Sequence, residues 1–113
     1  MTDLAVRRCV PCERGTPPLT QETAERLLAQ VPSWTLEAPG AALRRIFQCT
    51  DFKAAIAFVQ TVAELADAEG HHPDIAIHYR RVTLTLTTHA IRGLSENDFI
   101  LAAKINLLRP PTP

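Results

Sequence analysis

The sequence has no excess charge of either sign, which argues against partners that are recognised by charge alone. Its 12 lysines and arginines balance 12 aspartates and glutamates. No basic patch is therefore expected to neutralise phosphates, and no block of like charges suggests an interaction tail. We expect no nucleic-acid partner and no membrane partner.

Long hydrophobic runs are also missing. No segment approaches the roughly 18 consecutive apolar residues of a membrane span, and residues 1–7 lack the apolar stretch of a secretory signal. We therefore expect a cytoplasmic protein. Because 46% of the 113 residues are hydrophobic, the chain can build one domain with a single core.

Cysteine is scarce, and its spacing does not complete a known metal site. Cys9 and Cys12 form a single CxxC pair, and no second CxxC or HxxxH accompanies it to hold zinc. A redox CxxC normally opens a helix beside a strand, whereas Pro17 and Pro18 follow here. We expect Cys9, Cys12 and Cys49 to be reduced thiols and predict no metal.

The chain divides into an arm, one domain and a short tail. Residues 1–18 show neither a period of 2 nor one of 3.6 and contain several turn formers, so we predict an irregular or mobile N-terminal arm. The single domain is expected to span residues 19–108, and residues 109–113 form the tail.

Hydrophobic periodicity within the domain predicts three helices and two hairpins. Cap signals and a 3.6-residue period place helices at residues 20–31, 51–69 and 95–108. Alternating residues place strands at 34–36, 43–49, 75–79 and 82–86, with Pro39-Gly40 turning the first hairpin. The order α-β-β-α-β-β-α predicts an α+β fold, with a four-stranded antiparallel sheet covered on one face by three helices.

The second hairpin carries the chemistry. With residues 80–81 at the centre of its turn, Ile75 faces Leu86, and the same register sets His72 opposite His89. A slip of two residues preserves the parity of the faces and leaves the two histidines on a diagonal, still within reach of one small ligand. By the same parity Tyr79 belongs to the apolar face.

His71 lies where the second predicted helix gives way to the strand, directly after Gly70, and Asp67 precedes it by one helical turn. Imidazoles titrate near neutral pH, so His71, His72 and His89 together suit general acid/base chemistry on a neutral small molecule. Two alternatives compete with this interpretation. His71 alone would also suit a helix C-terminus, and three histidines can hold a metal, although adjacent residues rarely point at one ion.

These residues resemble the signature of the pterin-4a-carbinolamine dehydratase family. The similarity runs through Asp67-x-x-x-His71-His72-Pro73 and then Tyr79, His89 and Asp98. It extends from about Leu19 to Leu108, because it also covers Trp34, Asp51-Phe52-Lys53 and the segment 93–98.

The resemblance implies an enzyme that removes water from a 4a-hydroxytetrahydropterin to give a quinonoid dihydropterin, without a metal or an organic cofactor. His71, His72 and His89 would transfer protons, in roles that the sequence does not assign. Substrate binding is expected from Asp67, Gly70, Thr88 and Asp98. Asp98 also has a structural explanation as the capping-box residue of the third helix, and Asp67 as a solvated helix residue. Family members associate, so a homodimer or homotetramer is expected.

Three positions depart from the family pattern. Many members carry Asn in place of Arg80, and an aromatic or serine in place of Ile75 or Thr87. An arginine suggests a different turn, and loss of an aromatic near the histidines removes a stacking surface for the pterin. The alternative function is therefore a catalytically silent protein that binds other proteins. Relatives serve as a dimerisation cofactor for a homeodomain transcription factor, and a related branch assists RuBisCO assembly in α-carboxysomes.

Overall fold

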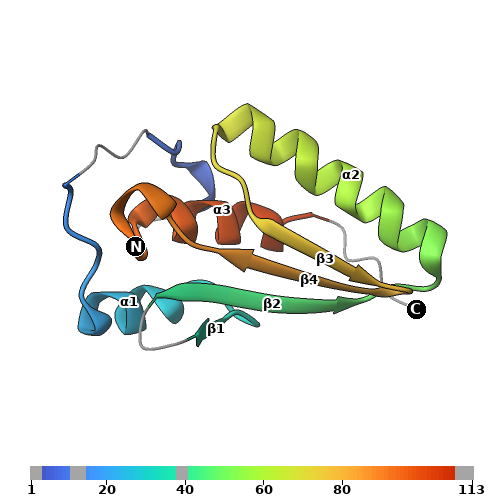
Figure 1. Cartoon of the computed structure of the whole chain (residues 1–113), viewed down its shortest axis with the longest axis horizontal. Helices are drawn as coiled ribbons and strands as arrows, with labels where there is room; N and C mark the ends of the chain where they lie inside the picture. Colours follow the sequence, from blue (N-terminus) through green and yellow to red (C-terminus); the bar gives the residue numbers. More distant parts are fainter. Residues whose placement is uncertain (1–3, 11–14, 38–40, 109–113) are drawn as a thin grey trace.

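A computed structural model describes residues 4–10, 15–37 and 41–108, and within these residues the chain has an α+β fold (Figure 1). Three α-helices and one four-stranded antiparallel sheet confirm the predicted class. The elements in chain order are α1 (Gln21–Leu28), β1 (Thr35–Glu37), β2 (Ala42–Gln48), α2 (Phe52–Glu69), β3 (Asp74–His78), β4 (Arg81–Leu86) and α3 (Glu96–Asn106). Two 3-10 turns are added, η1 (Leu4–Val6) and η2 (His89–Ile91).

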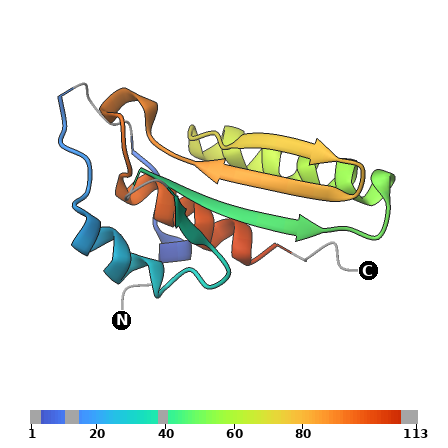
Figure 2. The same cartoon turned by 60° about the horizontal axis from the view of Figure 1, so that its bottom comes forward.

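The sheet has the strand order β1-β2-β4-β3, so the two longest strands lie in its centre (Figure 2). Alternation divides the side chains of β2 and β4 between two faces. The inward set is buried and consists of Leu43, Phe47, Val82, Leu84 and Leu86. This face shares one core cluster with Ala24 of α1, Phe58 of α2 and Leu101 of α3. Both views show α2 running along β3 and β4.

The register of the second hairpin differs from the prediction by two residues. Ile75 pairs with Leu84 rather than with Leu86, and His78 pairs with Arg81. The turn is therefore centred on Tyr79 and Arg80, one residue earlier than expected. The parity of the faces is unchanged, because a slip of two residues returns each side chain to the same side.

The prediction that Tyr79 lies on the apolar face was wrong. Tyr79 has a positive φ of 58° and is 68% exposed. A positive φ at only the first central residue is the pattern of a type II′ turn, which takes Tyr79 out of the strand alternation. The hairpin turn is therefore unusual, as the arginine at position 80 suggested, but the residue with the strained backbone is Tyr79.

The residues before the domain also pack against it. Leu4 of η1 is buried in the core cluster, and the Arg7 guanidinium lies 2.7 Å from the Glu96 carboxylate of α3. The packed region thus reaches beyond the expected start at Leu19. Other predictions fall outside the described residues: the Pro39-Gly40 turn, Cys12 and the tail 109–113.

Candidate active site

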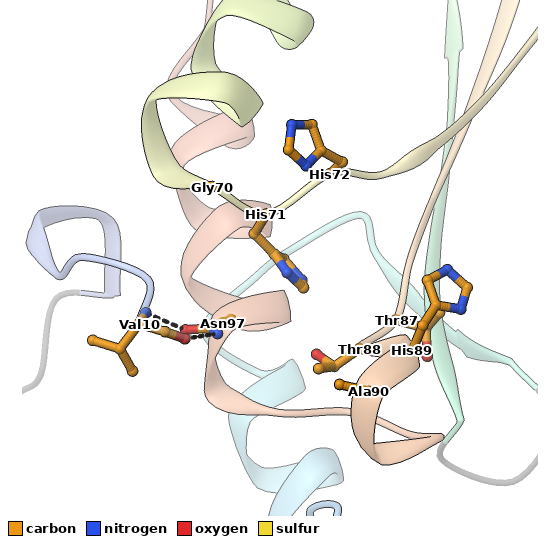
Figure 3. A pocket seen from close by; sticks show the side chains of 9 residues that line it. All are labelled: Val10, Gly70, His71, His72, Thr87, Thr88, His89, Ala90 and Asn97. Atoms are coloured by element: carbon orange, nitrogen blue, oxygen red, sulfur yellow. Dashed lines mark hydrogen bonds between the residues drawn. The ribbon is translucent and has the colours of Figure 1, made fainter. Parts of the chain in front are cut away.

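The end of α2 sets the position of His71. Gly70 adopts the left-handed conformation, with φ 67° and ψ 25°, which a residue without Cβ enters at little cost. The His71 amide then donates to the Ala66 carbonyl at 3.2 Å, and the Gly70 amide donates to the Asp67 carbonyl at 3.3 Å. These bonds close the last helical turn, and the His71 side chain points from this end of α2 into a pocket (Figure 3).

The His71 side chain contacts a buried carboxylate of α3, that of Asp98, which lies 27 residues later in the sequence. Its Nε2 atom lies 2.6 Å from Asp98 Oδ1, and the two side chains are 12% and 0% exposed. Asp98 stands in the first turn of α3, and its Oδ2 atom accepts the Ser95 amide at 3.0 Å, as the capping box predicts. The capping role is therefore correct but incomplete, because the other oxygen of Asp98 holds a histidine.

Thr88 completes the surroundings of the Asp98 carboxylate. The Thr88 hydroxyl donates to Asp98 Oδ2 at 2.8 Å, and it lies 2.7 Å from the Ser95 hydroxyl. Both donors, the Thr88 hydroxyl and the Ser95 amide, bond Oδ2, so Oδ1 remains to accept a hydrogen bond from a protonated Nε2 of His71. The other ring nitrogen of His71, Nδ1, then has its lone pair free for a ligand.

The other two histidines are more open to water. His72 Nε2 lies 2.9 Å from Asp67 Oδ1, and these side chains are 61% and 79% exposed. His89 begins η2, immediately after Thr88, and is exposed. Within the described residues its ring makes no hydrogen bond to another side chain or to the backbone. His72 and His89 can therefore exchange protons with solvent directly.

One pocket of about 360 Å³ gathers these groups (Figure 3). Its lining consists of Val10, Gly70, His71, His72, Thr87, Thr88, His89, Ala90 and Asn97. The three predicted catalytic histidines, Gly70 and Thr88 thus surround one space. The predicted substrate-binding residues Asp67 and Asp98 do not line it and instead bond His72 and His71.

The route by which the histidines converge differs from the one expected. His72 and His89 are not a cross-strand pair, because the β3–β4 ladder ends at Asp74 and Thr85. After β4 the Thr88 amide donates to the Gly93 carbonyl at 2.9 Å, which closes the loop that contains η2 and His89. Tertiary packing therefore brings together residues that the hairpin register alone would not.

Of the three departures from the family pattern, only Thr87 lines the pocket, and Ile75 and Arg80 lie elsewhere on the hairpin. The Thr87 hydroxyl donates to the Ala41 carbonyl at 2.7 Å, so this side chain ties the pocket wall to the start of β2. The sequence reasoning missed Val10, Ala90 and Asn97. Val10 belongs to an arm without periodicity, and Asn97 is one polar residue among many at a helix start.

The two cysteines that the structure describes, Cys9 and Cys49, are free thiols. Burial, followed by the charge of Glu69, raises the pKa of the half-buried Cys9 thiol to about 11, and burial also raises the pKa of Cys49. A thiol with a raised pKa stays protonated near neutral pH and is a poor nucleophile.

Among the described residues, no three His, Cys, Asp or Glu side chains are grouped so as to hold a metal ion. None of the described helices is long and apolar enough to cross a membrane.

Comparison with known proteins shows to which family the chain belongs. The model of the family described as pterin 4 alpha carbinolamine dehydratase matches residues 17–108. The chain belongs to this family. A protein of Methylococcus capsulatus named "Putative pterin-4-alpha-carbinolamine dehydratase" is 48% identical over 105 residues, which cover 93% of this chain and 92% of the relative. A protein of the same name from Aromatoleum aromaticum is 46% identical over 108 residues, or 96% of each chain.

A solved structure supports the same relationship. The crystal structure of a transcriptional coactivator/pterin dehydratase from Brucella melitensis matches with a TM-score of 0.73 and 32% identity, over 79% of this chain and 95% of that one. Pterin-4-alpha-carbinolamine dehydratases, for which the family is named, are hydro-lyases, enzymes that remove water from a substrate. The pocket described above therefore lies in a chain whose relatives are named for this chemistry.

Proposed function

We propose that this protein dehydrates 4a-hydroxytetrahydropterin to quinonoid dihydropterin by histidine general acid/base catalysis. The observation that carries the proposal is the convergence of His71, His72 and His89 on one pocket, with His71 held by the buried Asp98. Membership of the family supplies the substrate class.

The reaction is a redox-neutral elimination. The bond between C4a and its hydroxyl oxygen breaks, and the oxygen takes a proton and leaves as water. A ring nitrogen loses its proton to a base, and its electron pair forms the new C=N bond. Two proton transfers are needed, and positioned side chains typically accelerate each such step by about 10²- to 10⁴-fold.

His71 is the histidine best prepared for one of these transfers. If its Nε2–H donates to Asp98, Nδ1 accepts a proton from the substrate, and the carboxylate stabilises the imidazolium that forms. His72 and His89 are exposed and are suited to supply or collect the second proton. In this scheme His71 has a fixed orientation, whereas His72 and His89 exchange protons with water.

The direct test is the rate at which purified protein dehydrates enzymatically generated 4a-hydroxytetrahydropterin, followed by absorbance. Wild type should accelerate the reaction, and His71→Ala and His89→Ala should remove most of that acceleration. His78→Ala is the matched control, because His78 is the remaining histidine and lies exposed on β3, outside the pocket. Failure of a folded wild-type sample to accelerate dehydration would contradict the proposal.

A protein-binding role is the second candidate function, and the name of the Brucella melitensis structure, which includes "transcriptional coactivator", favours it. An assembly factor, for example for RuBisCO in α-carboxysomes, belongs to the same class. In either role a homodimer or homotetramer is proposed, which light scattering would test. A folded oligomer without turnover would favour this second function.

A further inference from the structure

The N-terminal arm, here residues 4–10, reaches the proposed active site. Val10 lines the pocket although it lies more than 50 residues before His71 in the sequence. Its amide donates to Asn97 Oδ1 at 3.0 Å, and its carbonyl accepts Asn97 Nδ2 (Figure 3). One buried side-chain amide therefore fixes both backbone polar groups of Val10, so that its position in the pocket is defined.

A buried carboxylate holds the arm one residue earlier. The side chain of Glu69, at the end of α2, is only 6% exposed. Its Oε1 atom accepts the Cys9 amide at 2.9 Å, and its Oε2 atom lies 3.2 Å from Arg8 Nε and 3.7 Å from Lys104 Nζ. The Cys9 amide is the main cause that lowers the pKa of Glu69. The carboxylate is thus built to stay charged and to hold the arm.

The residues that hold the arm are sequence neighbours of the residues that hold the site. Glu69 is separated from His71 only by Gly70, and Asn97 directly precedes Asp98. The end of α2 and the start of α3 therefore present Glu69 and Asn97 to the arm, and the same two segments hold His71 against Asp98 beside the pocket. The arm is docked on the same two backbone segments that position His71 and Asp98.

We propose that the arm forms one wall of the substrate pocket and that Val10 is a substrate-positioning residue on that wall. The inference rests on the proposed dehydratase function. Val10 is 64% exposed, so burial in the free protein does not account for its apolar side chain. An apolar side chain beside the histidines suits contact with the bound heterocycle, whose removal from water would be favourable.

Substitutions at Val10 test the contact, and Val6 supplies the matched control. Val6 lies in the same arm, is 74% exposed and is not in the pocket lining. Val10→Ala should raise KM for the 4a-hydroxytetrahydropterin about 5-fold and Val10→Trp at least about 10-fold, with kcat within about 2-fold, because apolar contacts discriminate on this scale. Val6→Ala and Val6→Trp should leave both constants unchanged.

Substitutions at Glu69 test the docking. Glu69→Ala removes the acceptor of the Cys9 amide and should raise KM, whereas Glu69→Gln keeps an acceptor oxygen and should restore most of the wild-type KM. Amide hydrogen exchange gives a readout independent of turnover. The Cys9 and Val10 amides should exchange at least about 10-fold faster in Glu69→Ala than in wild type, because an undocked arm leaves them open to water.

The outcomes separate this inference from the proposed function. Titration of each variant with 7,8-dihydropterin, followed by fluorescence, measures binding without turnover. Wild type that neither binds nor converts a pterin would overturn both. Wild type that converts the substrate, with Val10 variants no weaker in binding or KM than Val6 variants, would overturn the arm inference and leave the dehydratase proposal intact.

Discussion

Two adjacent histidines, His71 and His72, each contact a carboxylate, and the two pairs differ in how deeply they are buried. His71 and Asp98 are 2.6 Å apart with side chains 12% and 0% exposed, while His72 and Asp67 are 2.9 Å apart with side chains 61% and 79% exposed. Asp67 and His72 are five residues apart in the chain, whereas Asp98 lies 27 residues beyond His71. The geometry of the contacts is similar, and the surroundings differ.

Similar distances in the two pairs therefore do not imply similar interaction energies. Water screens the exposed pair, which by analogy with other surface ion pairs contributes about 0–1 kcal/mol. The buried pair sits where polar interactions are stronger and where an unpaired group is costly. Asp98 is also fixed by Thr88 and by the Ser95 amide, so it can hold the His71 ring in one orientation.

Replacing the two histidines one at a time should give the largest difference. We expect His71→Gln to lower kcat by about 10²- to 10³-fold, because it removes an oriented proton-transfer group. His72→Gln should lower it by about 10-fold or less, because its ring is held only by an exposed contact. Steady-state dehydration kinetics measure both. Equal losses would mean that orientation by Asp98 contributes nothing.

Removal of the two carboxylates should also change the protein's free energy of unfolding by different amounts. Asp98→Ala removes the acceptor of His71, Thr88 and the Ser95 amide, and it should lower the free energy of unfolding by about 3 kcal/mol. Asp67→Ala should change it by no more than about 0.5 kcal/mol. Urea unfolding followed by circular dichroism gives both values. A stable Asp98→Ala variant would show that the carboxylate is not a structural centre.

Thr88 tests whether the buried pair depends on its neighbour. Thr88→Val preserves the shape but removes the hydroxyl that donates to Asp98, and it should lower the free energy of unfolding by about 1–2 kcal/mol. Thr85→Val on β4 is the control, because Thr85 lies on the outer face of the sheet and is only partly buried. Should both variants lose the same stability, the hydroxyl of Thr88 would have no special role.

Acid should weaken the docking of the arm through Glu69, a third carboxylate. The pKa of Glu69 is lowered from its usual 4.5, chiefly by the hydrogen bond from the Cys9 amide. A carboxyl with a lowered folded-state pKa stabilises the protein above its unfolded pKa, and this contribution is lost as the pH falls through the folded value. The stability difference between wild type and Glu69→Gln should therefore be constant above about pH 5.5 and shrink below pH 4.5. A difference independent of pH would contradict this.

The elements of the fold were predictable because their signals are local. The cap at Thr20, the Gly70 stop and the Ser95 box all lie within a few residues of the turns they set. The hairpin register was missed because it depends on the conformation of Tyr79, a residue that rarely adopts positive φ. The first helix ends at Leu28, before Pro32, because the Gln30 and Val31 amides donate to carbonyls three residues earlier, those of Leu27 and Leu28, and form turns in place of α-helix.

The candidate site was predictable only in part. The residues of the family signature included His71, His72, His89 and Asp98, but no local pattern links His71 to Asp98 across 27 residues. The docking of the arm was harder to predict, because its contacts depend on single side chains such as Asn97 rather than on a hydrophobic period. Such long-range polar pairs arise from the packing of α2 against α3 and appear only once the fold is known.

The most direct test of the account compares kcat/KM of Asp98→Asn with that of Asp67→Asn, each relative to wild type. Both substitutions keep the side-chain shape and remove one negative charge beside a histidine. We expect Asp98→Asn to lose about 100-fold, because the amide no longer fixes the required tautomer of His71. Asp67→Asn should stay within about 3-fold, as expected for a screened surface pair. Similar losses in the two variants, or full activity in Asp98→Asn, would contradict the claim that the buried pair is the centre of the site.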